Sequence, residues 1–296
     1  MSEVAIVIPA YNSSRYIRLM IESALAQDTP AAEVLVVDDG SSDNTAEIAS
    51  SYSVVRVIRR ENGGDAAARN TGLQALGSEY VIFLDHDDLL HPAAVRTQLA
   101  AFSDDIDMVF GSNSLIDSDG APRGENRVAP RRFSARDVAL GTTPSFSQCM
   151  YRVSALNRIG GFRDKVGSAA DHDLNIRLLG REPRGYCHGE TVMSYRVHSG
   201  QQSYSPARLY AALLLVIEEH LGSGGMMDDP KLLRAVRRHW AGYFGQFLPL
   251  EIVRATVGGR YRDTVQALRL YLQGAPITFL GTADFLSKRV AKRLRS

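Results

Sequence analysis

The sequence predicts an α/β protein in which a mostly parallel sheet carries helices on both faces and a helical extension follows at the C-terminus. Short branched apolar runs at 4–8 and 34–37 lack polar alternation and are typical of strands buried on both faces. Amphipathic stretches separate such runs over the first 110 residues, and strands that alternate with helices indicate a parallel sheet. From Pro206 onward the pattern is helical.

The periodicity of the apolar residues gives the elements in order. Strands and helices alternate in the first part of the chain, at 4–8, 16–26, 34–37, 46–50, 54–58, 66–76 and 80–84. A loop-rich region follows, with strands expected at 108–112, 147–151 and 191–196 and a short helix at 173–179. The last third predicts helices at 207–221, 231–247, 261–272 and 283–294. Polar loops fall at the carboxyl ends of the first four strands, which is where α/β sheets bind ligands.

Composition limits the class of protein. With 296 residues, of which 45% are hydrophobic and 23% charged, the chain has ordinary globular composition. The longest stretch without Asp, Glu, Lys or Arg has 14 residues, and a membrane-spanning helix needs roughly 18. The N-terminus lacks the basic region of a secretory signal, and Cys149 and Cys187 cannot form a disulfide framework. We therefore expect a cytoplasmic protein.

The net charge of +1 conceals a strong asymmetry between the two ends of the chain. Residues 231–296 hold 13 Lys or Arg against 3 Asp or Glu, a net +10, so residues 1–230 carry −9. The stretch 285–296 reads FLSKRVAKRLRS and predicts a basic amphipathic helix. Such a helix suits an anionic membrane surface. A solvated helix packed on the protein's own acidic body is the alternative.

Acidic residues gather where two of the expected strands end. Asp85, Asp87 and Asp88 in FLDHDD place like charges close together, which raises their pKa values unless a cation neutralises them. Mg²⁺ or Mn²⁺, held by one or two carboxylates and a substrate's phosphates, would explain the cluster, whereas a solvated turn before the next helix is the alternative. Asp39 either reverses the chain after the second strand or accepts hydrogen bonds from a nucleobase or ribose.

Two common nucleotide-binding motifs are missing from the sequence. PAYNSS stands after the first strand instead of GxGxxG, and GxxxxGK[ST] does not occur, so NAD-dependent hydride transfer and P-loop phosphoryl transfer are disfavoured. Further along, Asp171 and Asp173 flank His172 at the start of a short helix, where either carboxylate caps the helix or acts in catalysis. His198, in YRVHSGQQS, is either a surface loop residue or part of a site beside the acidic strand ends.

Five motifs in order connect these residues to a known family. They are VAIVIPAYNSSRYI, VLVVDDGSSDNT, ENGGDAAARNTG, YVIFLDHDD and the pair ADHDLNIRLL with YRVHSGQQS, and they extend over residues 3–203. In these motifs the chain resembles the inverting family 2 glycosyltransferases with the GT-A fold, which has a Rossmann-like, mostly parallel sheet. The resemblance implies a donor-binding half at 1–110 and an acceptor-binding half at 111–205. The residue pattern itself predicts the helical, basic extension at 206–296.

The resemblance also implies roles for individual residues. Tyr11 would pack on the base of the donor nucleotide, Asp39 would bond that base, and Asp171 corresponds to the general base. The implied donor-binding positions are Pro9, Tyr11, Asp39, Arg69, Asp85 and His86. The implied ligands of a divalent metal, Mn²⁺ or Mg²⁺, are Asp87 and His198.

The chain departs from the family pattern at two places. Ala170 stands where the family usually has a Glu before the general base, and Asp173 is a rival for the role of Asp171. ENGG replaces the more usual Asn-Lys-Gly, which removes a positive charge near the diphosphate. That loss makes binding of the diphosphate more dependent on Asp87.

The resemblance implies an enzyme that moves a sugar from a nucleotide-diphospho-sugar, with UDP or dTDP donors favoured, to an acceptor hydroxyl by a single displacement. A glycan or lipid-linked acceptor of cell-surface polysaccharide or glycolipid assembly is expected, and no nucleic-acid partner. The basic extension suggests peripheral attachment to the inner face of the cell membrane. A non-catalytic nucleotide- or glycan-binding module and a sugar-phosphate nucleotidyltransferase on a similar fold are the alternatives.

Overall fold

The computed structural model describes residues 3–85, 87–197 and 205–273, which belong to two compact units. The first unit contains the sheet and takes in the described residues up to 197, without 139–141 and 166–172. Those two short stretches belong with the helices that follow residue 205 in the second unit.

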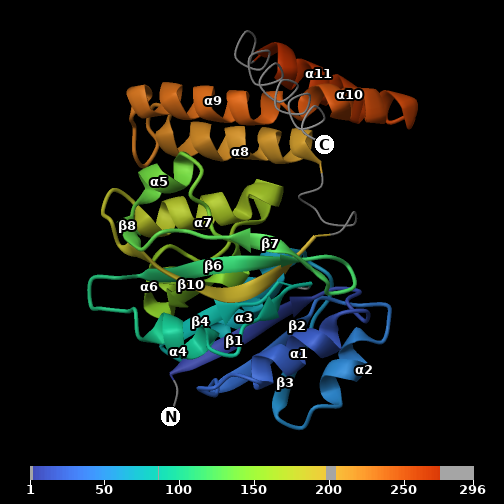
Figure 1. The fold of residues 1–296 in the computed structure, drawn as a ribbon, viewed down its shortest axis with the longest axis vertical. Helices are drawn as coiled ribbons and strands as arrows, with labels where there is room; N and C mark the ends of the chain where they lie inside the picture. The colour runs from blue at the N-terminus through green and yellow to red at the C-terminus, as the bar shows by residue number, and fades with distance from the viewer. Residues whose placement is uncertain (1–2, 86, 198–204, 274–296) are drawn as a thin grey trace, which may run out of the picture. The chain divides into compact units, whose positions relative to one another are not determined.

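A ten-stranded mixed sheet organises the first unit (Figure 1). The strands are β1 (Val4–Ala10), β2 (Glu33–Asp38), β3 (Val55–Arg59), β4 (Tyr80–Phe83), β5 (Leu89–Leu90), β6 (Met108–Ile116), β7 (Pro122–Asn126), β8 (Arg131–Phe133), β9 (Cys149–Arg152) and β10 (Gly185–Arg196). Along the order β3-β2-β1-β4-β9-β6-β10-β5, six of the eight strands point the same way, and β9 and β5 run against them. The predicted α/β class with a mostly parallel sheet is confirmed.

Helices pack on both faces of β1, the strand at the centre of the parallel part. Every residue of β1 is buried, as its unbroken apolar run predicts. Ile6 and Ile8 belong to the same core cluster as Met20 of α1 (Ile17–Leu25). Val7 points to the other face, where a Cβ added to Gly72 of α3 (Asp65–Gln74) would lie 2.5 Å from Val7 Cγ1. Only glycine lets α3 approach so closely.

Shorter helices complete the first unit and lead into the second. They are α2 (Thr45–Ser50), α4 (Ala94–Leu99), α5 (Ala135–Ala139), the 3₁₀ turns η1 (Phe146–Gln148) and η2 (Asp164–Ala169), α6 (Val153–Arg158) and α7 (Ala170–Leu179). The strands β7 and β8 were not expected from the sequence. All five residues of β7 are exposed, so no apolar pattern marks that strand.

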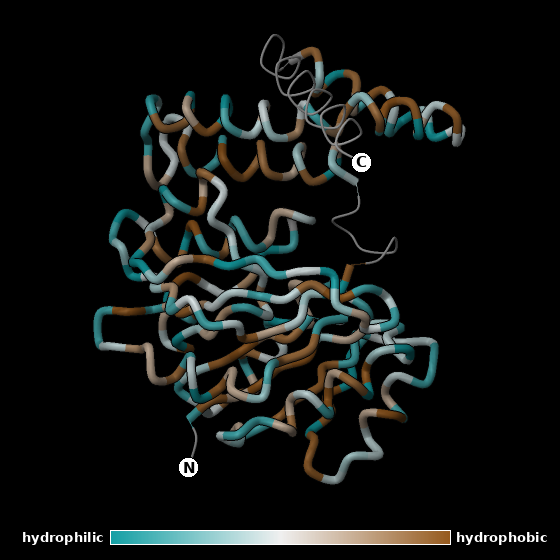
Figure 2. Tube along the Cα trace, in the orientation of Figure 1, coloured by the Kyte–Doolittle hydropathy of each residue, from teal (hydrophilic) through white to brown (hydrophobic). Residues whose placement is uncertain are grey.

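The second unit is helical, as predicted. Its helices are α8 (Pro206–Leu221), α9 (Pro230–Gly245), α10 (Leu248–Val257) and α11 (Tyr261–Gln273). Along these helices apolar and polar residues alternate with the helical period (Figure 2). The ring of Tyr210 on α8 stacks on Phe244 of α9, with centroids 4.8 Å apart.

One helix of the second unit, α10, was not expected. The predicted helix 231–247 ends at Gly245, and α10 begins three residues later with Pro249 in its first turn. Proline reads as a breaker in a helical pattern, but it is well tolerated in the first turn, where the missing N–H has no partner to lose. The expected helix at 283–294 lies outside the described residues. Among the helices that are described, none is long and apolar enough to cross a membrane.

Candidate functional site

Hydrogen bonds join the loops that follow β1 and β2. The N–H of Asn12 donates to Ser41 Oγ (3.0 Å), and Asn12 Oδ1 accepts from the N–H of Ser42 (2.9 Å). The N–H of Ser14 donates to Asp43 Oδ2 (3.1 Å). Asn12 has φ 48°, a left-handed conformation that Asn tolerates better than most residues. The two loops therefore form one frame at the carboxyl edge of the sheet.

Pro9 and Tyr11, both predicted to bind a donor, lie at this edge in different surroundings. Pro9 is buried within β1, in register with Val37 of β2. Tyr11 follows the last residue of the strand and is 49% exposed. Of the two, Tyr11 presents a side chain on which a ligand can pack.

Asp39 directly follows the last residue of β2, and its buried carboxylate holds the loop before α3. It accepts from Arg60 Nη1 (2.5 Å), from the N–H of Gly63 at both oxygens (3.1 and 3.2 Å) and from the N–H of Gly64 (2.7 Å). Gly64 has φ 86°, which favours glycine, and is the N-cap of α3. Asp39 thus fixes the start of the helix that carries Arg69.

The loop after β4 brings Asp85, Asp87 and Asp88 together in a tight turn. The N–H groups of Asp87 and Asp88 donate to the carbonyl of Asp85 at 2.9 and 3.2 Å. Arg69, predicted near the donor, donates from Nη2 to Asp85 Oδ1 (2.5 Å). Its guanidinium carbon also lies 4.5 Å from the centre of the Phe146 ring, so the buried Arg69 side chain contacts the half-buried Asp85 on one side and Phe146 on the other.

Asp88 lies deepest in this turn and is completely buried. Its Oδ2 accepts from Ser147 Oγ (2.8 Å) and its Oδ1 from the N–H of Arg196 (3.1 Å), while Ser147 Oγ accepts from the N–H of Asp85 (3.0 Å). Burial raises the pKa of Asp88 well above its ordinary value, and the negative charges of Asp87 and Asp85 raise it further.

Sequence reasoning missed Arg196, a buried arginine that shapes the acidic turn. Its Nε donates to the carbonyl of Asp87 (2.8 Å), and its Nη1 donates to the carbonyls of Asp117 (3.0 Å) and Ser118 (3.2 Å). The guanidinium carbon lies 4.6 Å from the centre of the Tyr16 ring. The signal was available, because this arginine belongs to the motif YRVHSGQQS, which starts within β10.

The donor atoms of the acidic turn suit a divalent cation. Carboxylate oxygens are the ligands that Mg²⁺ and Mn²⁺ prefer, and one or two carboxylates are enough where substrate phosphates complete the shell. Asp85 and Asp88 hydrogen-bond to neighbouring side chains, and Asp87 stands between them. No group of three or more His, Cys, Asp and Glu suited to a metal ion occurs in the described part of the chain. His86 and His198 lie outside it.

The two carboxylates at the start of α7 have different surroundings. Asp173 is buried and pairs with Arg163 and with Arg177 Nε (2.9 Å), and Arg177 also donates to the carbonyl of Gly161 (2.8 Å). These bonds give Asp173 a structural role in anchoring α7. Asp171 lies half-buried in the first turn of α7, directly after Ala170.

His172, between these carboxylates, packs within the second unit. Its ring centre lies 5.6 Å from that of Trp240 on α9, nearly edge to face. Trp240 in turn donates from Nε1 to the carbonyl of Ala139 (2.8 Å). Burial lowers the pKa of His172 to about 4, so the ring is neutral near pH 7. This contact fixes the turn that carries Asp171.

Comparison with known proteins gives the family of this chain. The sequence pattern described as "Glycosyl transferase family 2" matches residues 5–160, more than half of the chain. The chain belongs to glycosyl transferase family 2. The resemblance expected from the five motifs is thereby confirmed.

Relatives and solved structures agree with this membership. An uncharacterized glycosyltransferase from Rickettsia typhi is 32% identical over 209 residues, which are 67% of this chain and 65% of the relative. A chondroitin synthase from Escherichia coli is 33% identical over 181 residues, 59% of this chain but 26% of that protein. The chain therefore matches less than two thirds of the length of these relatives.

Two solved structures share the GT-A fold with this family member. S. aureus TarS residues 1–349 in complex with UDP-GlcNAc has a TM-score of 0.65 at 21% identity, covering 93% of this chain and 82% of that one. The mannosyltransferase PcManGT from Pyrobaculum calidifontis, in complex with GDP-Man and Mn²⁺, has a TM-score of 0.62 at 20% identity, covering 99% and 87%. At these identities the likeness shows the fold alone.

Proposed function

We propose that this family 2 member is an inverting glycosyltransferase that moves a sugar from a nucleotide-diphospho-sugar to an acceptor hydroxyl. The observation that carries the proposal is the buried acidic turn after β4, held by Arg69, Ser147 and Arg196. Bound UDP-GlcNAc in TarS and GDP-Man in PcManGT support a nucleotide-sugar donor. Residues 1–110 would bind the donor, and 111–205 the acceptor.

UDP and dTDP sugars are the donors we favour, since a carboxylate such as Asp39 suits the edge of uracil or thymine. Asp87 and His198 would hold Mn²⁺ or Mg²⁺, and the Mn²⁺ of PcManGT supports a divalent metal. When bound, such a cation would offset the negative charge of the leaving diphosphate. The other residues expected near the donor are Pro9, Tyr11, Arg69, Asp85 and His86.

The chemistry needs a single displacement with one proton acceptor. The acceptor oxygen bonds to the anomeric carbon from the face opposite the diphosphate, the bond from that carbon to the diphosphate oxygen breaks, and the configuration inverts. Asp171 takes the proton of the acceptor hydroxyl. Asp173 is poorly suited to this role, because Arg163 and Arg177 stabilise its charged form.

The general base is tested by Asp171→Asn, with Asp164→Asn as a matched control on an exposed carboxylate seven positions earlier. Asparagine keeps the size of the side chain but cannot accept the proton. Transfer should fall by about 10²-fold or more in Asp171→Asn, with donor affinity unchanged, and should stay normal in the control. Full activity in Asp171→Asn would remove the base from this position.

The metal is tested by titrating Mn²⁺ into Asp87→Ala and the unmodified protein while release of nucleoside diphosphate from UDP-GlcNAc is measured. We expect release of the nucleoside diphosphate to stop in EDTA and to return with Mn²⁺ in the unmodified protein. In Asp87→Ala, release should be lost even with Mn²⁺. Undiminished turnover in EDTA would contradict a metal role. A non-catalytic binding module would bind the donor without releasing the diphosphate.

A role in cell-surface polysaccharide or glycolipid assembly fits relatives named chondroitin synthase and hyaluronan synthase. The acceptor would then be a glycan or a lipid-linked molecule. We further propose that the protein works in the cytoplasm and attaches peripherally to the inner face of the membrane through the basic segment 231–296.

A further inference from the structure

The helices α10 and α11 expose an unusual number of large apolar side chains. Their exposed fractions range from 43% to 85%. The residues are Leu250, Val253 and Val257 on α10, and Tyr261, Val265, Leu268 and Leu272 on α11. Scattered single residues of this kind are ordinary on a protein surface, but a contiguous set marks an interaction site.

Spacing places each set on one face of its helix. Steps of three and four residues separate the members, which is the period of a single helical face. The opposite faces are buried in the second unit, through Leu248 and Ala255 on α10 and Ala267 and Leu270 on α11. Both helices are therefore apolar on two sides, and protein covers one of them.

The rim of these exposed faces is basic. Arg254 comes four residues after Leu250 and so lies next to it on the helix surface. On α11, Arg262 and Arg269 directly follow Tyr261 and Leu268 of the apolar row. All three arginines are exposed. Because the arginines have long flexible stems, their charges can reach a surface against which the apolar row packs.

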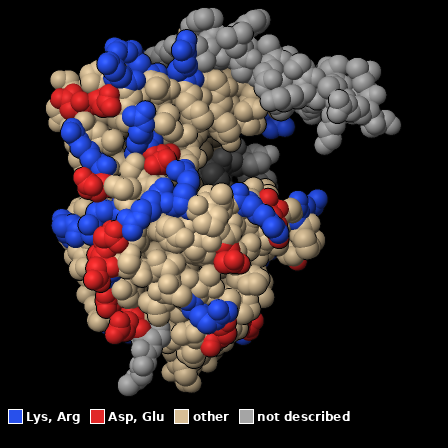
Figure 3. Space-filling model, turned by 60° about the vertical axis from the view of Figure 1, so that its left-hand side comes forward, with Lys and Arg blue, Asp and Glu red and all other residues tan. Residues whose placement is uncertain are grey.

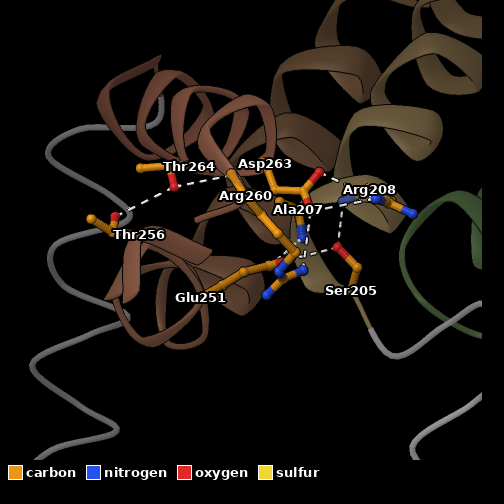
Figure 4. A network of polar contacts seen from close by, with 8 residues as sticks. All are labelled: Ser205, Ala207, Arg208, Glu251, Thr256, Arg260, Asp263 and Thr264. Atoms are coloured by element: carbon orange, nitrogen blue, oxygen red, sulfur yellow. Dashed lines mark hydrogen bonds and ion pairs between the residues drawn. The ribbon is translucent and has the colours of Figure 1, made fainter. Parts of the chain in front are cut away.

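The two acidic residues of these helices are engaged in structural contacts (Figure 4). Glu251 is buried, accepting from Ser205 Oγ (2.5 Å) and from the N–H of Ala207 (2.7 Å) at the start of α8. Asp263 pairs with Arg208 (3.2 Å) and Arg260 (3.0 Å). Neither offsets the charge of the basic rim, so an anionic partner is favoured.

Charge distinguishes among the partners that could bind this surface. A second copy of the chain would oppose one basic rim with another, and the segment 274–296 carries five Lys or Arg against one Asp. On the face in Figure 3, acidic and basic side chains lie beside one another. An anionic lipid surface meets both the apolar row and the arginines.

We propose that the exposed faces of α10 and α11 dock on an anionic lipid bilayer, with the apolar row entering the interface and the arginines meeting lipid phosphates. This inference rests on the proposed function, which supplies the inner face of the membrane as the location and a lipid-linked molecule as the acceptor. It assigns the contact to a defined pair of helices rather than to the basic segment as a whole.

Vesicle co-sedimentation of the full chain tests the proposal. Vesicles of phosphatidylcholine alone and of phosphatidylcholine with 30% phosphatidylglycerol, chosen to vary only the charge, are compared at low and high salt. The disrupting variant is Val257→Asp with Val265→Asp, both at exposed positions. The matched control is Leu215→Asp, because Leu215 is 70% exposed but lies on α8.

We expect the unmodified protein and Leu215→Asp to bind the anionic vesicles, and the double variant to bind at least about tenfold more weakly. Replacing Arg262 and Arg269 with Gln should cost about fivefold per arginine at low salt. Circular dichroism and melting temperature establish that each variant is folded. Binding by the double variant equal to that of the control would overturn the proposal.

Two further outcomes would also overturn it. One is vesicle binding that is lost when residues 274–296 are deleted and is unaffected by the double variant. The other is a protein dimer in solution that the double variant converts to a monomer, without vesicle binding by either. Donor hydrolysis with UDP-GlcNAc and Mn²⁺, measured without lipid, distinguishes these failures from a failure of the proposed catalytic function.

Discussion

Replacing Arg196 with Met should destabilise the protein strongly and loosen the acidic turn. The substitution keeps a long apolar stem but removes the donors to the carbonyls of Asp87, Asp117 and Ser118. A buried acceptor left without its partner costs about 1 kcal/mol or more, and the lost contact with the Tyr16 ring adds about 0.5–1 kcal/mol. The expected loss in unfolding free energy is therefore about 4 kcal/mol.

Urea unfolding followed by circular dichroism measures this loss, with Arg96→Met as the matched control. Arg96 is 60% exposed and pairs with Asp28, which is 40% exposed, so its removal should cost less than about 1 kcal/mol. Donor affinity, measured with UDP in the presence of Mn²⁺, should also fall in Arg196→Met and stay normal in the control. A loss below about 1 kcal/mol for Arg196→Met would refute the structural role assigned to this side chain.

Three other changes test separate parts of the fold. Although burial opposes it, hydrogen bonds from Thr45 lower the pKa of Asp43 to about 2. About 1 kcal/mol of unfolding free energy should therefore be present above pH 4 and be lost as the pH falls through 2. Asp43→Asn should not show this pH-dependent loss. Gly111→Ala should cost over about 2 kcal/mol in urea unfolding, because the new Cβ would strike the Glu190 carbonyl. Trp240→Phe should lower stability by about 1 kcal/mol through one lost hydrogen bond.

The sequence was sufficient for the strands of the parallel part. β1, β2 and β4 are buried on both faces, so their residues are apolar without alternation, and that pattern is hard to mistake. Weaker signals failed for a physical reason in each case. β7 is exposed along its whole length, and the first turn of α10 contains Pro249, which suggests an interruption when tertiary packing is unknown.

The candidate site was predicted through its acidic residues but not through the residues that hold them. Strand ends and charge pointed to Asp39, Asp85 and Asp87, because polar residues at the carboxyl edge of a sheet have few structural explanations. Ser147 and Arg196 are far from the turn in sequence, 59 and 109 positions from Asp88 and Asp87 respectively, so only the folded chain brings them together.

The contacts of the acidic turn fix its shape in the absence of any ligand. Arg196 donates to the backbone carbonyl of Asp87, so the turn is fixed through its main chain. Arg69 and Ser147 hold the side chains of Asp85 and Asp88 on either side of it. A ligand that binds such a turn has little conformational entropy to remove, and preorganisation of this kind favours affinity. We therefore expect variants of Arg196 and Ser147 to weaken donor binding even though neither side chain is assigned a contact with the donor.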